Sequence, residues 1–166
     1  DRVWTRTTDL TTLVAHAREI EQAIADGEEA ATGTDLRPRI HEAVEQAVGD
    51  ADSDAVDSVF DPPETPLSAD LSATLFETVV KLVVEDAAGR APDGVTVDAT
   101  ATPPTVRVSA APTASTERSA TDRTDDVTIL VVRLAVEQIG GEVSVTRDGD
   151  RRRVTVEFPP PDGGDR

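Results

Sequence analysis

The stretch RLAVEQIGGEVSV at residues 133–145 decides the fold, because it contains a helix end, a tight turn and the start of a strand. Apolar residues at helical spacing run up to Ile139, and Gly140-Gly141 then ends the helix. Alternation of apolar and polar residues begins at Glu142. A second strand is predicted over 152–158, across a turn at 148–150. A helix that leads directly into a hairpin predicts helices packed on a sheet.

Upstream of this stretch, residues 71–88 form the most apolar predicted helix, which Ser68 or Asp70 is expected to cap. Two alternating runs, 95–97 and 106–108, predict a further hairpin, joined through residues 102–104. Residues 109–125 have low complexity and predict a mobile loop before a last helix from about Asp126. The helix over 71–88 is apolar on more than one side, which predicts a place in the centre of the core. Its apolar residues are Leu71, Leu75, Phe76, Val79, Val80, Leu82, Val83 and Val84.

The N-terminal part of the chain predicts a helix over 8–26, with Thr8 or Asp9 as its cap and Gly27 as its stop. Apolar residues repeat on two heptad positions, which is typical of a coiled-coil seam that needs a partner helix. The predicted dimer seam is Leu10, Leu13, Ala17, Ile20 and Ile24. A second helix opens at Thr34-Asp35, and a short strand is expected over 56–60.

This order of elements predicts an α+β fold. The expected architecture is a two-layer sandwich with one mixed β-sheet and helices on one face, preceded by a coiled-coil-type helix. We divide the chain into a dimerisation-type helix at 1–30, a main domain at 31–160 and a disordered tail at 161–166.

The amino-acid composition excludes several classes of function. The chain carries 33 acidic and 16 basic residues, a net charge of −17, which excludes an ordinary nucleic-acid binder. It has no Cys, and no apolar run approaches the ~20 residues of a membrane span, so we expect a cytoplasmic domain. Lys81 is the only Lys, and the carboxylates are evenly spread, which favours a halophilic cytosol. The alternative is an acidic patch that docks a basic partner.

From about residue 10 to 158 the chain resembles the C-terminal half of a sensor histidine kinase. Residues 71–88 are similar to the N-box helix of that family, and 133–145 to its closing helix, double glycine and following strand. Residues 153–159 match the way such domains end. The resemblance implies a dimerisation helix followed by a histidine-kinase-like ATPase domain of the GHKL type, acting in a two-component system.

The family's nucleotide-contact motifs are altered in this chain. The N-box Asn that holds Mg²⁺ corresponds to Asp86, or to Glu85 on the other register, and the chain contains no Asn at all. A carboxylate is a possible Mg²⁺ ligand, but it also repels phosphate. The Asp and two Gly of the adenine-reading turn correspond to Ala110, Pro112 and Ala114.

The phosphate-cradling motif at the start of the last helix is altered as well. It corresponds to residues 126–128, so Asp126 and Thr128 stand where the family has glycines. A carboxylate at a helix N-terminus opposes an anionic ligand. All three motifs therefore predict a degenerate nucleotide site, with no cofactor and no catalytic residue expected.

The remaining polar clusters predict no site. His16 lies off the seam without a nearby Pro, unlike a phospho-acceptor, and His41 is interpreted as a solvated or packing residue. The run 151–153 is interpreted as an ion-paired strand end. Four carboxylates that lack EF-hand spacing predict no metal site; they are Asp50, Asp52, Asp54 and Asp57.

The leading hypothesis is a degenerate histidine-kinase-like domain that signals through protein contacts, as a homodimer or with a partner signalling protein. The alternative is a divergent histidine kinase that binds Mg-ATP through Asp86 or Glu85 and phosphorylates a His outside this chain. A third hypothesis is an acidic domain that occupies a basic surface. No nucleic-acid partner is expected.

Overall fold

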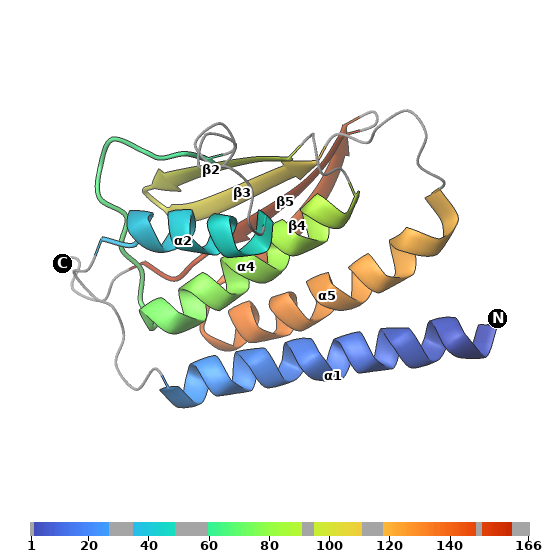
Figure 1. Cartoon of the computed structure of the whole chain (residues 1–166). Coiled ribbons are helices and arrows are strands. Elements are labelled where there is room, and N and C mark those ends of the chain that lie inside the picture. The colour runs from blue at the N-terminus through green and yellow to red at the C-terminus, as the bar shows by residue number, and fades with distance from the viewer. Residues whose placement is uncertain are drawn as a thin grey trace.

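The computed structural model describes residues 2–26, 35–48, 60–90, 95–110, 118–148 and 151–160. Within these ranges the chain forms helices and a single sheet, and two of the strand pairs are consecutive in sequence (Figure 1). In chain order they are α1 (Arg2–Asp26), α2 (Arg37–Val48), β1 (Phe60–Asp61), α4 (Ala73–Arg90), β2 (Val95–Ala101), β3 (Pro104–Ala110), α5 (Arg118–Gln138), β4 (Glu142–Asp148) and β5 (Arg151–Glu157).

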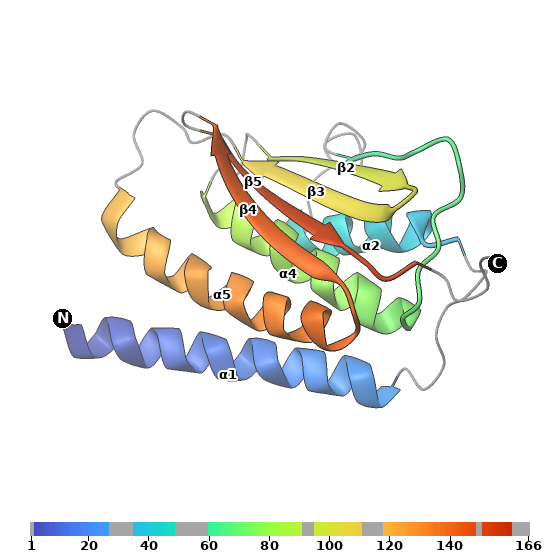
Figure 2. The same cartoon turned by 180° about the vertical axis from the view of Figure 1, so that it is seen from behind.

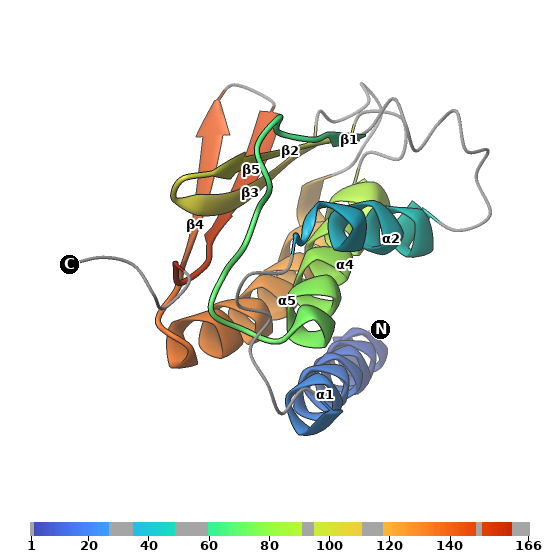
Figure 3. The same ribbon diagram turned by 90° about the vertical axis from the view of Figure 1, so that its left-hand side faces the viewer.

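The five described strands form one mixed sheet in the order β1-β2-β3-β5-β4. The β1 strand runs parallel to β2, and the other neighbouring pairs are antiparallel. Figure 3 shows the helices on one side of this sheet, with α1 farthest from it. The predicted α+β sandwich is therefore confirmed.

The α4 helix occupies the centre of the core, as its apolar pattern predicts. All eight apolar residues expected there are buried, and the Phe76 ring lies 4.7 Å from the Phe158 ring, centroid to centroid. The predicted cap is wrong, however. Ser72 caps the helix, because its Oγ accepts a hydrogen bond of 3.1 Å from the Leu75 N–H. Only the residue directly before the first turn can reach that N–H group, so Ser68 and Asp70 are too far upstream.

The stretch 133–145 folds as its sequence predicts. The Gly141 N–H donates to the Val136 carbonyl at 2.9 Å, the Gly140 N–H donates to the Glu137 carbonyl at 3.1 Å, and Gly140 has a φ of 92°. These bonds form a Schellman motif, which requires the left-handed conformation that glycine adopts without strain. A Cβ on Gly141 would lie 2.5 Å from the Glu157 carbonyl oxygen, so both glycines are needed.

Two predicted helix starts are wrong. The α5 helix begins at Arg118, so residues 118–125 are helical and not part of a loop. No Gly or Pro interrupts this segment, and Ser, Thr and Asp each cost only about 0.7 kcal/mol or less in a helix. The α1 helix begins at Arg2, which places Thr8 and Asp9 inside the helix. Residues 109 and 110 of the predicted loop belong to β3, because the ladder with β5 continues through them. Residues 111–117 of that loop lie outside the described residues, as does most of the strand expected over 56–60.

The α1 helix packs against α4 and α5 of the same chain. Ile20 of the predicted dimer seam is 5% exposed and belongs to the shared core, so it is not available to a second molecule in this arrangement. A helix that packs on its own domain turns one side inward, and Ile20 lies on that side; the dimer seam as a whole stays a prediction. Ala17 is half-buried and Ile24 is exposed, while the side chains of Leu10 and Leu13 lie outside the description.

Candidate functional site

Asp86, the residue expected at the N-box position, points into the protein. Its side chain is 1% exposed, and its Oδ2 lies 2.8 Å from a guanidinium nitrogen of Arg152 on β5. Arg152 is also buried, with a side chain that is 9% exposed. The pair joins the central helix to the sheet and neutralises both charges within the core. The interpretation of 151–153 as an ion-paired strand end is therefore confirmed at Arg152.

Ala110 lies next to this ion pair. It is buried at the end of β3, directly across the strand pair from Arg152. One residue earlier, Ser109 accepts a hydrogen bond of 3.3 Å from Arg153 Nε. The fold therefore brings two predicted site positions, Asp86 and Ala110, to the same arginine. Pro112 and Ala114 lie outside the described residues.

Glu85, the alternative N-box position, belongs to a separate group of charges. Its carboxylate lies 4.0 Å from the Lys81 ammonium, which also lies 3.9 Å from Glu19 on α1. Burial raises the pKa of the Glu85 carboxyl, and the neighbouring Lys81 charge opposes that shift. Glu85 and Asp86 are therefore adjacent in sequence but take different partners, one on α4 itself and one on the sheet.

Thr128 is buried between α5 and α1. Its hydroxyl lies 3.2 Å from Nδ1 of His16, which makes a polar contact between the two helices. The backbone of Asp126 is helical, and its side chain lies outside the description. Thr128 thus has a hydrogen-bond partner on α1.

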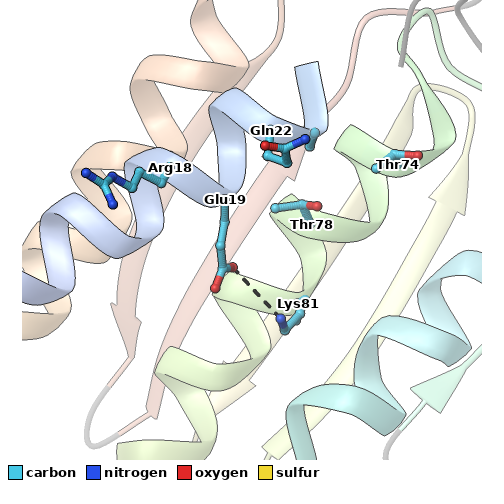
Figure 4. A pocket seen from close by; sticks show the side chains of 7 residues that line it. Arg18, Glu19, Gln22, Thr74, Thr78 and Lys81 are labelled. Carbon is cyan, nitrogen blue, oxygen red and sulfur yellow. Dashed lines mark ion pairs between the residues drawn. The ribbon is translucent and has the colours of Figure 1, made fainter. Parts of the chain in front are cut away.

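A shallow groove of about 470 Å³ lies between α1 and α4 (Figure 4). Sequence reasoning missed it, because it exists only where α1 packs on the domain. The one available signal is Lys81, the only Lys in the chain. The groove is lined by Arg18, Glu19, Gln22, Ala23, Thr74, Thr78 and Lys81.

Within the described ranges, no three His, Asp or Glu side chains gather as a metal site requires. The carboxylates of residues 50–57 lie outside those ranges. None of the described helices is both long enough and apolar enough to cross a bilayer.

No protein-family model matches the sequence, and no curated protein sequence does. Solved histidine kinases have similar structures. AdeS of Acinetobacter baumannii has a TM-score of 0.61 at 11% identity, covering 95% of this chain and 82% of that one. The cytoplasmic segment of QseC has a TM-score of 0.54 at 12% identity, and the match covers 89% of this chain and 95% of that segment. Full-length ShkA in complex with AMPPNP has 0.62 at 14%, covering 93% of this chain and 36% of ShkA. The chain therefore has a histidine-kinase-like fold.

Proposed function

We propose that this chain is a histidine-kinase-like signalling domain that retains the fold, has lost Mg-ATP binding and acts through protein contacts. The observation that carries the proposal is the buried ion pair between Asp86 and Arg152. A divalent cation prefers oxygen ligands that are free to coordinate it. Here the carboxylate at the N-box position is 1% exposed, and a guanidinium already balances its charge.

The free-energy cost of separating Asp86 from Arg152 disfavours metal binding at Asp86. Removing one partner of a buried ion pair costs about 3–5 kcal/mol. A cation that took Asp86 from Arg152 would have to offset a penalty of that order. Since each ~1.4 kcal/mol changes an affinity tenfold, the penalty corresponds to roughly two to three and a half factors of ten in Mg²⁺ affinity. Tight Mg-ATP binding through Asp86 is therefore not expected.

The exposed apolar side chains support a role in protein contacts. Val14 and Ile24 on α1 are 48% and 46% exposed, and Leu130 and Leu134 on the neighbouring α5 are 49% and 56% exposed. Large apolar side chains that are exposed on two adjacent helices are candidates for a protein contact. We include in the proposal that Ile24 and the outward part of α1 mediate self-association or contact with a partner signalling protein.

The proposed setting is a cytosol at high salt. The net charge of −17 and the near absence of Lys support it, because carboxylates keep a protein soluble where salt screens their repulsion. The similarity to the cytoplasmic segment of QseC supports a cytoplasmic location.

Calorimetry with Mg-ATP tests this function, at a KCl concentration where circular dichroism shows a folded protein. We expect no binding heat and no thermal shift at millimolar Mg-ATP, and no autophosphorylation. A low-micromolar dissociation constant that is lost in Asp86→Ala would overturn the proposal in favour of a divergent kinase. Because Asp86→Ala removes a buried partner, Glu85→Gln serves as a second variant that keeps the ion pair. Binding lost only in Glu85→Gln would overturn the proposal equally, through the other register.

A further inference from the structure

The two edges of the sheet differ in how they are protected from other chains. Among the described strands, β1 lies at one edge and β4 at the other. The β1 strand has two residues and leads into Pro62-Pro63, and a short strand next to proline is a poor template for pairing. The β4 strand has seven residues, and its middle part, 143–146, contains neither a charge nor a proline. Its outer edge has no strand neighbour in the described ranges, so β4 can pair with one more strand.

The α5 helix packs against β4 and exposes two large apolar side chains. Leu130 and Leu134 are 49% and 56% exposed, the highest values among the large apolar side chains that the structure describes. They are four residues apart, so they lie one turn apart on the same face of the helix. Figure 3 shows β4 and the C-terminal end of α5 on the side of the molecule opposite α2. The open strand edge and the exposed leucines therefore belong to neighbouring elements.

The charge of this region differs from that of the rest of the chain. Residues 127–147 span most of β4 and the C-terminal part of α5, and they contain two Arg, two Glu and no Asp or Lys. Their net charge is zero, and the rest of the chain carries the whole −17. A basic partner is attracted to acidic surfaces, whereas a second copy of an acidic chain meets the least repulsion at a neutral one. The charge pattern therefore favours a second copy of this chain as the partner.

The sequence of β4 also selects a register for antiparallel pairing with itself. A two-fold axis perpendicular to the sheet places each residue opposite one on the same sheet face. An axis at Val145 places Glu142 opposite Asp148 of the second copy, and like charges directly opposite destabilise a strand pair. An axis at Ser144 removes that contact and places Val143 opposite Val145, which gives two apolar cross-strand pairs. A shift in the other direction places a valine opposite an arginine instead.

We propose that two copies of this chain associate through β4 and α5, with the β4 strands paired antiparallel about Ser144. The same two-fold axis keeps both helical layers on one face of the joined sheet, so Leu130 and Leu134 of the two copies approach each other. The inference rests on the proposed role in protein contacts and names a second copy as the partner at this face. It leaves the outward side of α1 to a partner signalling protein.

Oxidative cross-linking of Ser144→Cys tests the strand pairing, because the chain has no Cys of its own. Residues directly opposite in antiparallel strands have Cβ atoms about 4.5–5.5 Å apart, close to the separation that a disulfide needs. We expect diamide to produce covalent dimers of Ser144→Cys at micromolar protein, in KCl that keeps the protein folded. Thr96→Cys is the matched control and should remain monomeric, since Thr96 is exposed on β2, which has a strand neighbour on each side. Equal cross-linking of the two variants would overturn the strand pairing.

Sedimentation equilibrium tests the contribution of the leucines. We expect the wild type to dimerise at micromolar protein, and Leu130→Gln with Leu134→Gln to weaken dimerisation by about tenfold or more, because the contact covers four leucine side chains. Val14→Gln is the matched control on α1, since Val14 is 48% exposed, and it should leave the dimer unchanged. Circular dichroism of each variant excludes loss of folding as the cause.

Two results would overturn the proposal. One is a wild type that stays monomeric, and the other is a dimer that Val14→Gln breaks while the leucine variant does not. The second result would assign self-association to α1. Neither result bears on the loss of Mg-ATP binding, which calorimetry tests separately.

Discussion

Helices α4 and α1 lie side by side but are held in the protein by different forces. The α4 side chains are buried on several faces, and they include the fully buried Phe76 and Val79. In α1, among the side chains that the structure describes, only Ile20 and Ala23 are buried. Figure 2 shows α1 along the outside of the helical layer. One helix is part of the core, and the other rests on it.

The energies of the two contacts differ accordingly. Each fully buried Val, Leu or Phe of α4 contributes about 1.5–3 kcal/mol. The polar contacts of α1 include the His16–Thr128 hydrogen bond at 3.2 Å and the Glu19–Lys81 ion pair at 3.9 Å. Such contacts contribute roughly 0–1.5 kcal/mol each. The difference implies that α4 folds with the domain, whereas α1 can separate from it at a much smaller cost.

The largest effect is expected for Phe76→Ala in α4. Phe76 is 0% exposed and packs on Phe158, so its removal leaves a cavity. We expect a loss of about 3–5 kcal/mol in the free energy of unfolding, measured by urea denaturation at constant KCl. Val14→Ala is the control on α1, since Val14 is 48% exposed, and it should change stability by only about 0.5 kcal/mol. Equal losses in the two variants would contradict the division into core and peripheral helix.

A smaller and more local effect is expected for Ile20→Ala in α1. Ile20 is 5% exposed, whereas Ile24 on the same helix is 46% exposed. We expect Ile20→Ala to cost about 2 kcal/mol, near the lower limit for buried isoleucine. Hydrogen exchange should show this loss as faster exchange in 2–26, with α4 still protected. Ile24→Ala should leave exchange unchanged in a monomer. Faster exchange in Ile24→Ala together with a smaller mass by sedimentation would instead identify Ile24 as a dimer contact.

The contrast between a core helix and a peripheral helix also explains which parts of the fold could be predicted from the sequence. The α4 helix and the turn at Gly140-Gly141 follow from local patterns, because apolar spacing and glycine conformation need no distant partner. The start of α5 does not follow from local pattern, because its first residues are weak helix formers. Packing of α5 against α1 supports the helix, and the sequence does not show that contact. The Asp86–Arg152 pair joins residues 66 apart in sequence. The sequence does indicate that Arg152 is buried, because it alternates in step with Val154 and Val156 and so lies on the same, buried face of β5.

The last prediction concerns Glu85, where α4 faces α1. Burial is the main cause of the raised pKa of this carboxyl, with the Lys81 charge opposing it and the Glu19 charge adding to it. The folded protein therefore binds this proton more tightly than the unfolded chain does. It follows that the carboxyl lowers stability at neutral pH, and that the loss disappears as the pH falls below the ordinary value of 4.5.

Glu85→Gln removes the buried charge and tests this link between the two helices. We expect a small rise in melting temperature at pH 7, with the gain shrinking to nothing near pH 4, because both proteins are then uncharged at residue 85. Glu45→Gln on the exposed part of α2 is the control for removal of a surface carboxylate from another helix. If Glu85→Gln instead lowers the melting temperature at pH 7, the attraction of Lys81 outweighs burial. The two helices would then be held together by a stronger ionic contact than a 4.0 Å separation implies.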